Sequence, residues 1–181
     1  MSKHKIRNFT VTDTVIGRGG MGVVYQGMRE FSGLDRQEPV ACKMIRAELA
    51  ADAEYEELFL REAFTAMRLA HPHLVQVHDC VRENGTIYLF MEFIDGISLG
   101  ALVKHHGPLP ESLVANITYR AAKALSYLHG EEIRHRDVSP PNILISKEGH
   151  VKVSDFGLAR TNHEGHSSRI GFKGRLPFAC P

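Results

Sequence analysis

The sequence predicts an α+β fold in two parts, a β-rich first part with one main helix and a helical second part. Three observations predict this class. Runs of β-branched and aromatic residues dominate the first 95 residues, a single stretch among them has helical periodicity, and the longest amphipathic helix begins after residue 110. With 181 residues, of which 43% are hydrophobic, the chain can bury a core as one domain or two small lobes.

The first part is expected to contain five strands and one helix. In the helical stretch at residues 52–70, apolar residues recur at intervals of three and four, and Pro72 disfavours its continuation. The strands are expected at residues 9–17, 21–28, 39–45, 74–81 and 86–94.

The second part is expected to contain two helices and two short strands. Residues 111–130 have an apolar face and end at Gly130, a typical C-terminal cap. A shorter helix is expected at residues 98–106, and strands at 142–145 and 150–154. The seam between the parts is expected within residues 92–96.

Charge and cysteine content exclude several classes of protein. The 22 basic and 21 acidic residues nearly cancel, so we expect no nucleic-acid partner. Three widely spaced cysteines without a CxxC pair favour a reducing compartment over a disulfide framework. No signal peptide and no run of about 18 apolar residues is present, so we expect no membrane segment in this chain. The expected class is soluble and cytoplasmic.

Gly17, Gly19 and Gly22 form a GxGxxG pattern, in which glycines let backbone N–H groups approach phosphates. Alone, the pattern is as often a chance loop or hairpin turn. A dinucleotide-binding fingerprint would open a helix, whereas the strand-forming residues VVYQG follow here. The glycines are therefore expected at the tip of a hairpin.

Lys43 lies within the apolar run VACK. A lysine in such a strand either reaches solvent, as on an edge strand, or meets an anion. Glu62, on the apolar side of the expected helix, is its candidate partner. A pair between them could hold the lysine ammonium against phosphate oxygens.

The segment HRDVSPPN places Asp137 and Asn142 in a proline-rich loop between a long helix and a short strand. An aspartate there could accept or orient a hydroxyl proton, and the asparagine amide oxygen could bind a divalent metal. Asp155, in SDFG, is suited to hold Mg²⁺ that bridges phosphates. Taken singly, each aspartate could equally be a turn or cap residue.

Together these motifs resemble the eukaryotic-type, or Hanks-type, protein kinase family. The glycine loop, VACK, the glutamate of REA, HRD with an asparagine five residues on, and DFG occur in the family's order. The likeness extends from about Asn8 to Pro181, and HRDVSPPN resembles bacterial serine/threonine kinases in particular. It implies a two-lobed fold that binds ATP between the lobes, with the N-lobe at residues 1–94 and a partial C-lobe at 95–181.

The resemblance implies a role for each site residue. Asp137 would be the catalytic base, with Lys43 and Glu62 completing the catalytic set. Asn142 and Asp155 would hold Mg²⁺. The nucleotide contacts would come from Gly17, Gly19, Gly22, Val24, Ala41, Lys43, Met91 as gatekeeper, Glu92, Ile94 and Leu144. Candidates for regulatory phosphorylation would be Thr161, Ser167 and Ser168.

Two features depart from the family. Ser139 stands where serine/threonine kinases usually carry a lysine, so another group, for which Arg175 is a candidate, would have to meet the γ-phosphate charge. The family's APE motif would fall at Cys180 and Pro181 with its glutamate missing, so the remaining C-lobe helices are absent from this chain. The helix at 111–130 is then expected to expose an apolar patch through which the chain could self-associate.

Three functions remain open. The first is an ATP-dependent serine/threonine protein kinase, or its truncated catalytic part, which phosphorylates a protein hydroxyl. The missing helices motivate a second, a catalytically impaired nucleotide-binding or regulatory module. A small-molecule phosphotransferase is a weaker third, because those enzymes usually lack the HRD and DFG forms found here.

Overall fold

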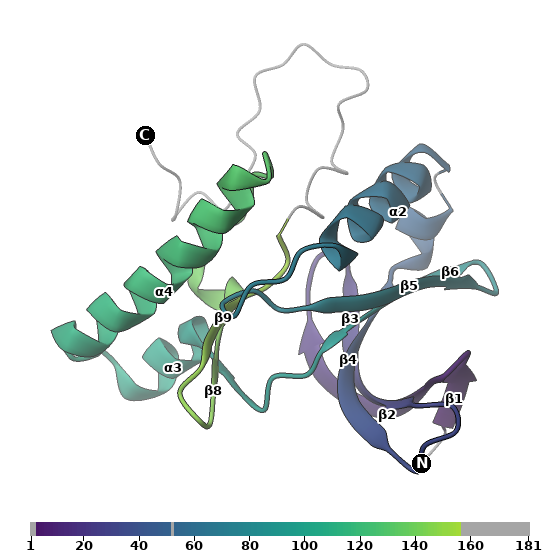
Figure 1. The fold of residues 1–181 in the computed structure, drawn as a ribbon, viewed down its shortest axis with the longest axis horizontal. Helices are drawn as coiled ribbons and strands as arrows, with labels where there is room; N and C mark the ends of the chain where they lie inside the picture. Colours follow the sequence, from purple (N-terminus) through teal and green to yellow (C-terminus); the bar gives the residue numbers. More distant parts are fainter. Residues whose placement is uncertain (1–2, 52, 157–181) are drawn as a thin grey trace. The chain divides into compact units, whose positions relative to one another are not determined.

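The computed structural model describes residues 3–51 and 53–156 and divides the chain into two units (Figure 1). The first unit comprises Met1–Leu69 and Gln76–Phe93, and the second comprises Ala70–Val75 and Ile94–Pro181. The first unit is rich in strands and has one main helix, whereas the second has two helices and a small sheet. The predicted α+β class is therefore confirmed.

The first unit is built on a six-stranded antiparallel sheet with the order β1-β2-β3-β4-β6-β5. Its strands are β1 (Lys3–Ile6), β2 (Phe9–Arg18), β3 (Gly22–Glu30), β4 (Gln37–Ile45), β5 (Val77–Glu83) and β6 (Thr86–Glu92). The short helix α1 (Ala47–Ala50) precedes α2 (Ala53–Met67), which packs against β5 (Figure 1). The apolar face of α2 buries Tyr55, Phe59, Ala63 and Ala66.

The sheet curls on itself around an aromatic pair. Phe9 on β2 and Phe90 on β6 stack with ring centroids 3.9 Å apart, although two strands separate β2 from β6 in the sheet. Both belong to one cluster of buried side chains, completed by Ile6, Val11, Val40, Cys42 and Val81. The curl therefore brings β2 and β6, which are not neighbours in the sheet, into one core.

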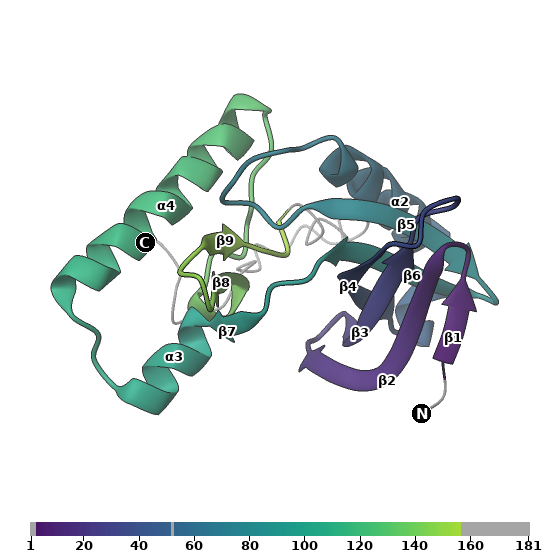
Figure 2. The same ribbon diagram turned by 60° about the horizontal axis from the view of Figure 1, so that its bottom comes forward.

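The second unit combines two helices with a three-stranded sheet (Figure 2). Its elements are α3 (Leu99–His106), α4 (Glu111–Gly130), the 3₁₀ turn η1 (Pro140–Asn142) and the strands β7 (Gly96–Ser98), β8 (Ile143–Ser146) and β9 (Val151–Val153). The buried face of α4, formed by Ile117, Ala121, Ala124 and Leu128, packs on β9. In the part of the chain that the structure describes, no helix has both the length and the hydropathy needed to cross a bilayer.

The observed strands differ from the predicted ones at three places. β1 and β7 were not predicted, because KHKI and GIS carry little of the β-branched and aromatic signal. The strand expected from residue 74 begins instead at Val77. Leu74 forms an isolated parallel bridge to Val153 and so belongs to the second unit.

The two cysteines in the described residues, Cys42 and Cys80, are free and buried. Burial raises the pKa of each thiol to about 12. Their role is therefore that of small core side chains, which agrees with the expectation that these two do not belong to a disulfide framework.

Candidate functional site

The glycine motif lies at the tip of the β2–β3 hairpin, as predicted. β2 ends at Arg18 and β3 begins at Gly22, and the Gly19 N–H donates to the Gly22 carbonyl at 2.9 Å. The segment after β4 anchors this tip, because the Arg46 N–H donates to the Met21 carbonyl at 3.1 Å. The Arg46 guanidinium also donates to the Gly19 carbonyl at 3.4 Å. The tip is thus tied to the sheet by its backbone.

Gly22 is required by the sheet itself. A Cβ at Gly22 would lie 2.1 Å from the Met44 carbonyl oxygen, whereas one at Gly19 would meet no described atom within 4 Å. A Cβ at Gly17 would make only ordinary contact with Val24, at 3.6 Å. One glycine of the motif is therefore fixed by close strand packing, and the other two have no such steric need.

Four predicted nucleotide contacts share one face of the sheet in the first unit. Val24 on β3 is the register partner of Lys43 on β4, and Met91 on β6 is the partner of Ala41. Directly paired residues of adjacent strands lie on the same face. Cys42, between Ala41 and Lys43, points to the opposite face and into the aromatic core. The register therefore gathers Val24, Ala41, Lys43 and Met91.

Lys43 is buried on a central strand. β4 lies between β3 and β6, and only 5% of Lys43 is exposed, which excludes the edge-strand alternative. Glu62 lies on α2 between the buried residues Phe59 and Ala63, and its two carboxylate oxygens are buried. A buried ammonium is costly unless it is compensated by an anion. The predicted Lys43–Glu62 pair is compatible with this burial and stays a prediction.

The predicted adenine contacts after Met91 fall at the end of β6. The Glu92 N–H donates to the Gln76 carbonyl at 2.8 Å, so a nucleotide contact at Glu92 would have to use its carbonyl oxygen. Ile94 follows in the second unit and is half-buried. Leu144, also in the second unit, lies on β8 opposite Ser98 and Lys152 and is half-buried.

In the second unit, Asn142 holds Asp137. The Asn142 side-chain amide donates to the Asp137 carboxylate oxygen Oδ2 at 2.8 Å and to the Asp137 backbone carbonyl at 2.9 Å. Asn142 is 5% exposed and closes the turn η1, where its N–H donates to the Ser139 carbonyl. The spacing of five residues is therefore used for a direct contact that orients the carboxylate.

The same loop is tied to the residue before Asp155. His135 is 2% exposed, and its Nε2 lies 3.0 Å from the Ser154 carbonyl, while the Asp137 N–H donates to its Nδ1. The ring therefore carries its proton on Nε2. Burial lowers the pKa of His135, which favours this neutral form. The sequence reading assigned no role to His135 or Ser154, whose contacts are not visible in a local pattern.

Arg136 and Asp155 have left-handed backbone angles, with φ of 65° and 58°. Glu132, earlier in the same loop as Arg136, has φ of 60° and no predicted role. Such angles cost about 1 kcal/mol or more in side-chain-bearing residues and collect at functional sites. Since such angles also occur at Arg7, Asn84 and Glu132, the assignment of Asp137 and Asp155 to the site stays a prediction.

The residues predicted to hold Mg²⁺ fit that ion chemically. Because both amide hydrogens of Asn142 are committed to Asp137, the amide oxygen is the group left to bind a cation. Asp155 adds a carboxylate, and Mg²⁺ commonly takes one or two protein oxygens together with water and phosphate. Within residues 3–51 and 53–156 there is no group of three or more His, Cys, Asp or Glu side chains that could hold a metal.

Ser139 is closed off from solvent. It is 2% exposed, and its hydroxyl donates to the Asp137 carbonyl at 3.5 Å. The residue that replaces the usual lysine is therefore small, neutral and buried. The candidates Thr161, Ser167, Ser168 and Arg175 lie outside the described residues.

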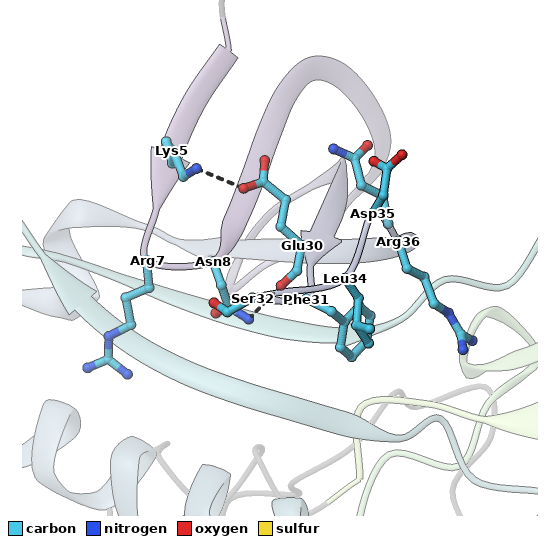
Figure 3. A pocket seen from close by; sticks show the side chains of 10 residues that line it. Lys5, Arg7, Asn8, Glu30, Phe31, Ser32, Leu34, Asp35 and Arg36 are labelled. Atoms are coloured by element: carbon cyan, nitrogen blue, oxygen red, sulfur yellow. Dashed lines mark hydrogen bonds and ion pairs between the residues drawn. The ribbon is translucent and has the colours of Figure 1, made fainter.

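A surface pocket of about 540 Å³ in the first unit contains none of the predicted site residues (Figure 3). Its cations already have partners, since Lys5 pairs with Glu30 at 2.7 Å and Arg7 with Asp79 at 3.4 Å. It is lined by Lys5, Arg7, Asn8, Glu30, Phe31, Ser32, Leu34, Asp35, Arg36 and Gln37. We assign no function to it.

A curled antiparallel sheet with a buried lysine, followed by a helical unit with an Asp–Asn loop and a second aspartate, defines the kinase class of fold. The family model of the protein kinase domain matches residues 10–181, and this chain belongs to that family. Serine/threonine-protein kinase PrkC of Bacillus subtilis is 40% identical over 145 residues, which cover 80% of this chain and 22% of that protein. PknD of Mycobacterium tuberculosis is 40% identical over 157 residues, 87% of this chain and 23% of that protein.

Solved structures are similar to this chain over most of its length. The PknI kinase domain of Mycobacterium tuberculosis matches with a TM-score of 0.73 and 32% identity, over 86% of this chain and 62% of that one. Rad53 in complex with AMP-PNP matches with a TM-score of 0.72 and 28% identity, over 87% of this chain and 40% of that one. The chain spans about a quarter of the length of the curated relatives it matches.

Proposed function

We propose that this chain is the ATP-binding and catalytic part of a serine/threonine protein kinase, which transfers the ATP γ-phosphate to a protein hydroxyl. The observation that carries the proposal is the 2.8 Å hydrogen bond by which Asn142 orients the Asp137 carboxylate. Membership of the protein kinase family and the serine/threonine kinases among its relatives support it.

In the first unit, the proposed task is to bind the nucleotide. The N–H groups of the loop around Gly17, Gly19 and Gly22 would approach the phosphates, and the buried Lys43 ammonium, with Glu62, would bind them. Val24, Ala41 and Met91, on the face of Lys43, would contact the adenine, with Glu92 at its edge.

In the second unit, the proposed task is to prepare the acceptor hydroxyl and to hold Mg²⁺. Asp137 would orient the hydroxyl and accept its proton, while Asn142 and Asp155 would bind the metal. Mg²⁺, when bound, neutralises charge on the transferred group. Ile94 and Leu144 would add apolar contacts to the adenine.

Intact-mass spectrometry after incubation with Mg·ATP and a serine- and threonine-containing protein tests the proposal. We expect wild type to add phosphate to itself or to the protein, and Asp137→Asn to lower the rate by about 100-fold or more, because general base catalysis typically contributes that much. Asp95→Asn is a matched control, since Asp95 is exposed and pairs only at the surface with Lys147. Equal rates for wild type and Asp137→Asn would contradict the assignment of the base.

Ser139 favours a second candidate, a nucleotide-binding module without transfer. A buried neutral residue at that position adds no positive charge beside a γ-phosphate. In that case, calorimetry would detect Mg·ATP binding to wild type, and the mass measurement would detect no transfer by wild type. Transfer by Ser139→Lys would then identify the missing charge as the cause, whereas transfer by wild type would contradict this second candidate.

A further inference from the structure

Four residues of the second unit, Asp137 among them, form a closed ring of hydrogen bonds. Asn142 donates to Asp137, Ser154 donates to Asn142, the Ser154 carbonyl accepts from His135, and His135 accepts the Asp137 N–H. The four residues come from the loop before η1, from η1 itself and from the residue after β9. The proposed chemistry uses neither His135 nor Ser154, and of these two Ser154 is the one that contacts Asn142.

Ser154 contacts Asn142 at two points. Its N–H donates to the Asn142 carbonyl at 2.9 Å, and its hydroxyl donates to the same oxygen at 3.2 Å. Ser154 is 9% exposed, so water competes little for this hydroxyl. Any residue at 154 except proline could supply the N–H bond, whereas the second bond requires a hydroxyl.

The two contacts from Ser154 fix the backbone of Asn142 and so help to orient its side chain. Asn142 has backbone bonds on both sides, to Ser139 through its N–H and to Ser154 through its carbonyl. Its side-chain amide then reaches Asp137 at two oxygens. Rotation of the peptide at Asn142 would therefore lengthen the bonds to Asp137 and turn the amide oxygen away from the direction in which a cation would bind.

We propose that the Ser154 hydroxyl is a positioning group for the catalytic loop, which acts through the Asn142 carbonyl to hold the Asn142 amide in the orientation that serves Asp137 and Mg²⁺. This inference rests on the proposed function, in which Asn142 is a metal ligand.

The test compares Ser154→Ala with wild type in two measurements. The first is the dissociation constant of Mn²⁺, used as the probe metal with saturating ADP and followed by the free-ion signal in electron paramagnetic resonance. We expect Ser154→Ala to weaken Mn²⁺ binding by about 3- to 10-fold, the usual range for one buried hydrogen bond that orients a ligand. The second is the NMR signal of the Asn142 side-chain amide in the metal-free protein, which should shift and exchange faster.

Two variants separate positioning from general stability. Ser154→Thr keeps a hydroxyl and should restore Mn²⁺ binding to within about 2-fold of wild type. Ser146→Ala removes an exposed hydroxyl that bonds the His150 N–H at 3.2 Å in the same unit, and it should leave both measurements unchanged. If Ser154→Ala does not fold, Ser154→Cys keeps the volume with a weak donor and should show the same weakening.

The outcomes distinguish this inference from the proposed function. Unchanged Mn²⁺ binding and an unchanged Asn142 amide signal in Ser154→Ala would overturn the inference, even if the free energy of unfolding fell. Absence of Mn²⁺ binding to wild type with ADP would overturn the proposed metal site. The Asn142 amide signal of the metal-free protein would then still decide whether Ser154 positions Asn142.

Discussion

Gly22 of the glycine motif has to be a glycine because its surroundings leave no room for a Cβ atom. The Gly22 backbone runs so close to β4 that a Cβ would overlap the Met44 carbonyl oxygen, at 2.1 Å. Gly19, three residues earlier, has open space at the same position. The motif thus combines a packing requirement with the backbone access that phosphate binding needs, and sequence alone gives both glycines the same weight.

Gly22→Ala should destabilise the protein by about 1–3 kcal/mol, because β3 must move away from β4 to admit the methyl group. The free energy of unfolding, from urea denaturation, measures the change. Gly19→Ala, the matched control, should alter that free energy by less than about 1 kcal/mol. Equal losses in both variants would show that the strands do not approach as closely as described.

Lys43 could be singled out from the sequence, whereas Ser154 could not. Lys43 was found by its chemistry, since a charged residue within an apolar strand stands out in any sequence. Its burial on a central strand became certain only through the pairing of β4 with both β3 and β6. Ser154 was not found, because a serine before an aspartate is ordinary, and its hydroxyl gains a role only where β9 brings it to Asn142.

At the scale of elements, α4 is joined to a segment far away in the sequence. The Tyr127 hydroxyl accepts the Ala70 N–H at 3.3 Å, and the His71 ring stacks on the Tyr127 ring with centroids 5.2 Å apart. The His73 ring nitrogen Nδ1 lies 3.0 Å from the Val151 carbonyl on β9. Aromatic stacking and two polar contacts therefore hold Ala70–Val75 in the second unit.

These contacts predict a loss of stability in acid. Burial lowers the pKa of His71, and the nearby His73, Lys123 and Lys152 lower it further. Protonation therefore favours the unfolded chain, in which the pKa is near 6.5. The stabilising contribution is present above that value and is lost as the pH falls through the lowered folded-state pKa.

We expect the free energy of unfolding to decrease from about pH 7.5 to about pH 5.5, by at most about 1.4 kcal/mol per pH unit for each histidine involved. Burial lowers the pKa of His78 and His135 as well, which adds in the same direction. Urea denaturation across this range is the measurement. His71→Gln should reduce the slope, and His105→Gln, at an exposed position on α3, should keep it. A slope unaffected by His71→Gln would contradict the assignment.

The long helices were predictable as elements, whereas two strands were not. α2 and α4 each carry an apolar stripe with helical spacing, and the structure buries that stripe in both. β1 has mostly polar residues and forms because all four of its residues pair with β2. Strand formation of this kind depends on a partner strand, which no local pattern reports.

At the scale of the whole molecule, α4 carries apolar side chains that the described part of the chain does not cover. Leu113 is 41%, Val114 45% and Tyr119 63% exposed. The stripe formed by Ile117, Ala121, Ala124 and Leu128 is buried on β9. Leu113 continues this stripe one turn earlier, whereas Tyr119 lies on the other side of the helix. The apolar stripe that the sequence led us to expect as exposed is therefore largely buried on β9, with these three side chains left exposed, and the association expected from it stays a prediction.

We expect the chain to self-associate at about 100 μM through the exposed side chains of α4, because exposed apolar side chains favour burial against another surface. Sedimentation velocity should show a lower average mass for Leu113→Glu combined with Val114→Lys. Val15→Thr combined with Ile16→Thr is the matched control, since those residues are 38% and 43% exposed on β2 in the first unit. A monodisperse wild-type monomer at this concentration would contradict the prediction.

The class of fold, the family and the candidate site residues could be predicted from the sequence, because periodicity, glycine placement and charged residues in apolar runs are local properties. Tertiary structure decided which of these residues meet. The β-sheet register places Val24, Ala41, Lys43 and Met91 on one face, and the turn η1 brings Asn142 onto Asp137. It also decided that Gly22 admits no side chain and that Ser154 contacts Asn142. Such contacts join segments that are apart in the chain, and they form only when pairing and burial outweigh the conformational entropy lost on folding.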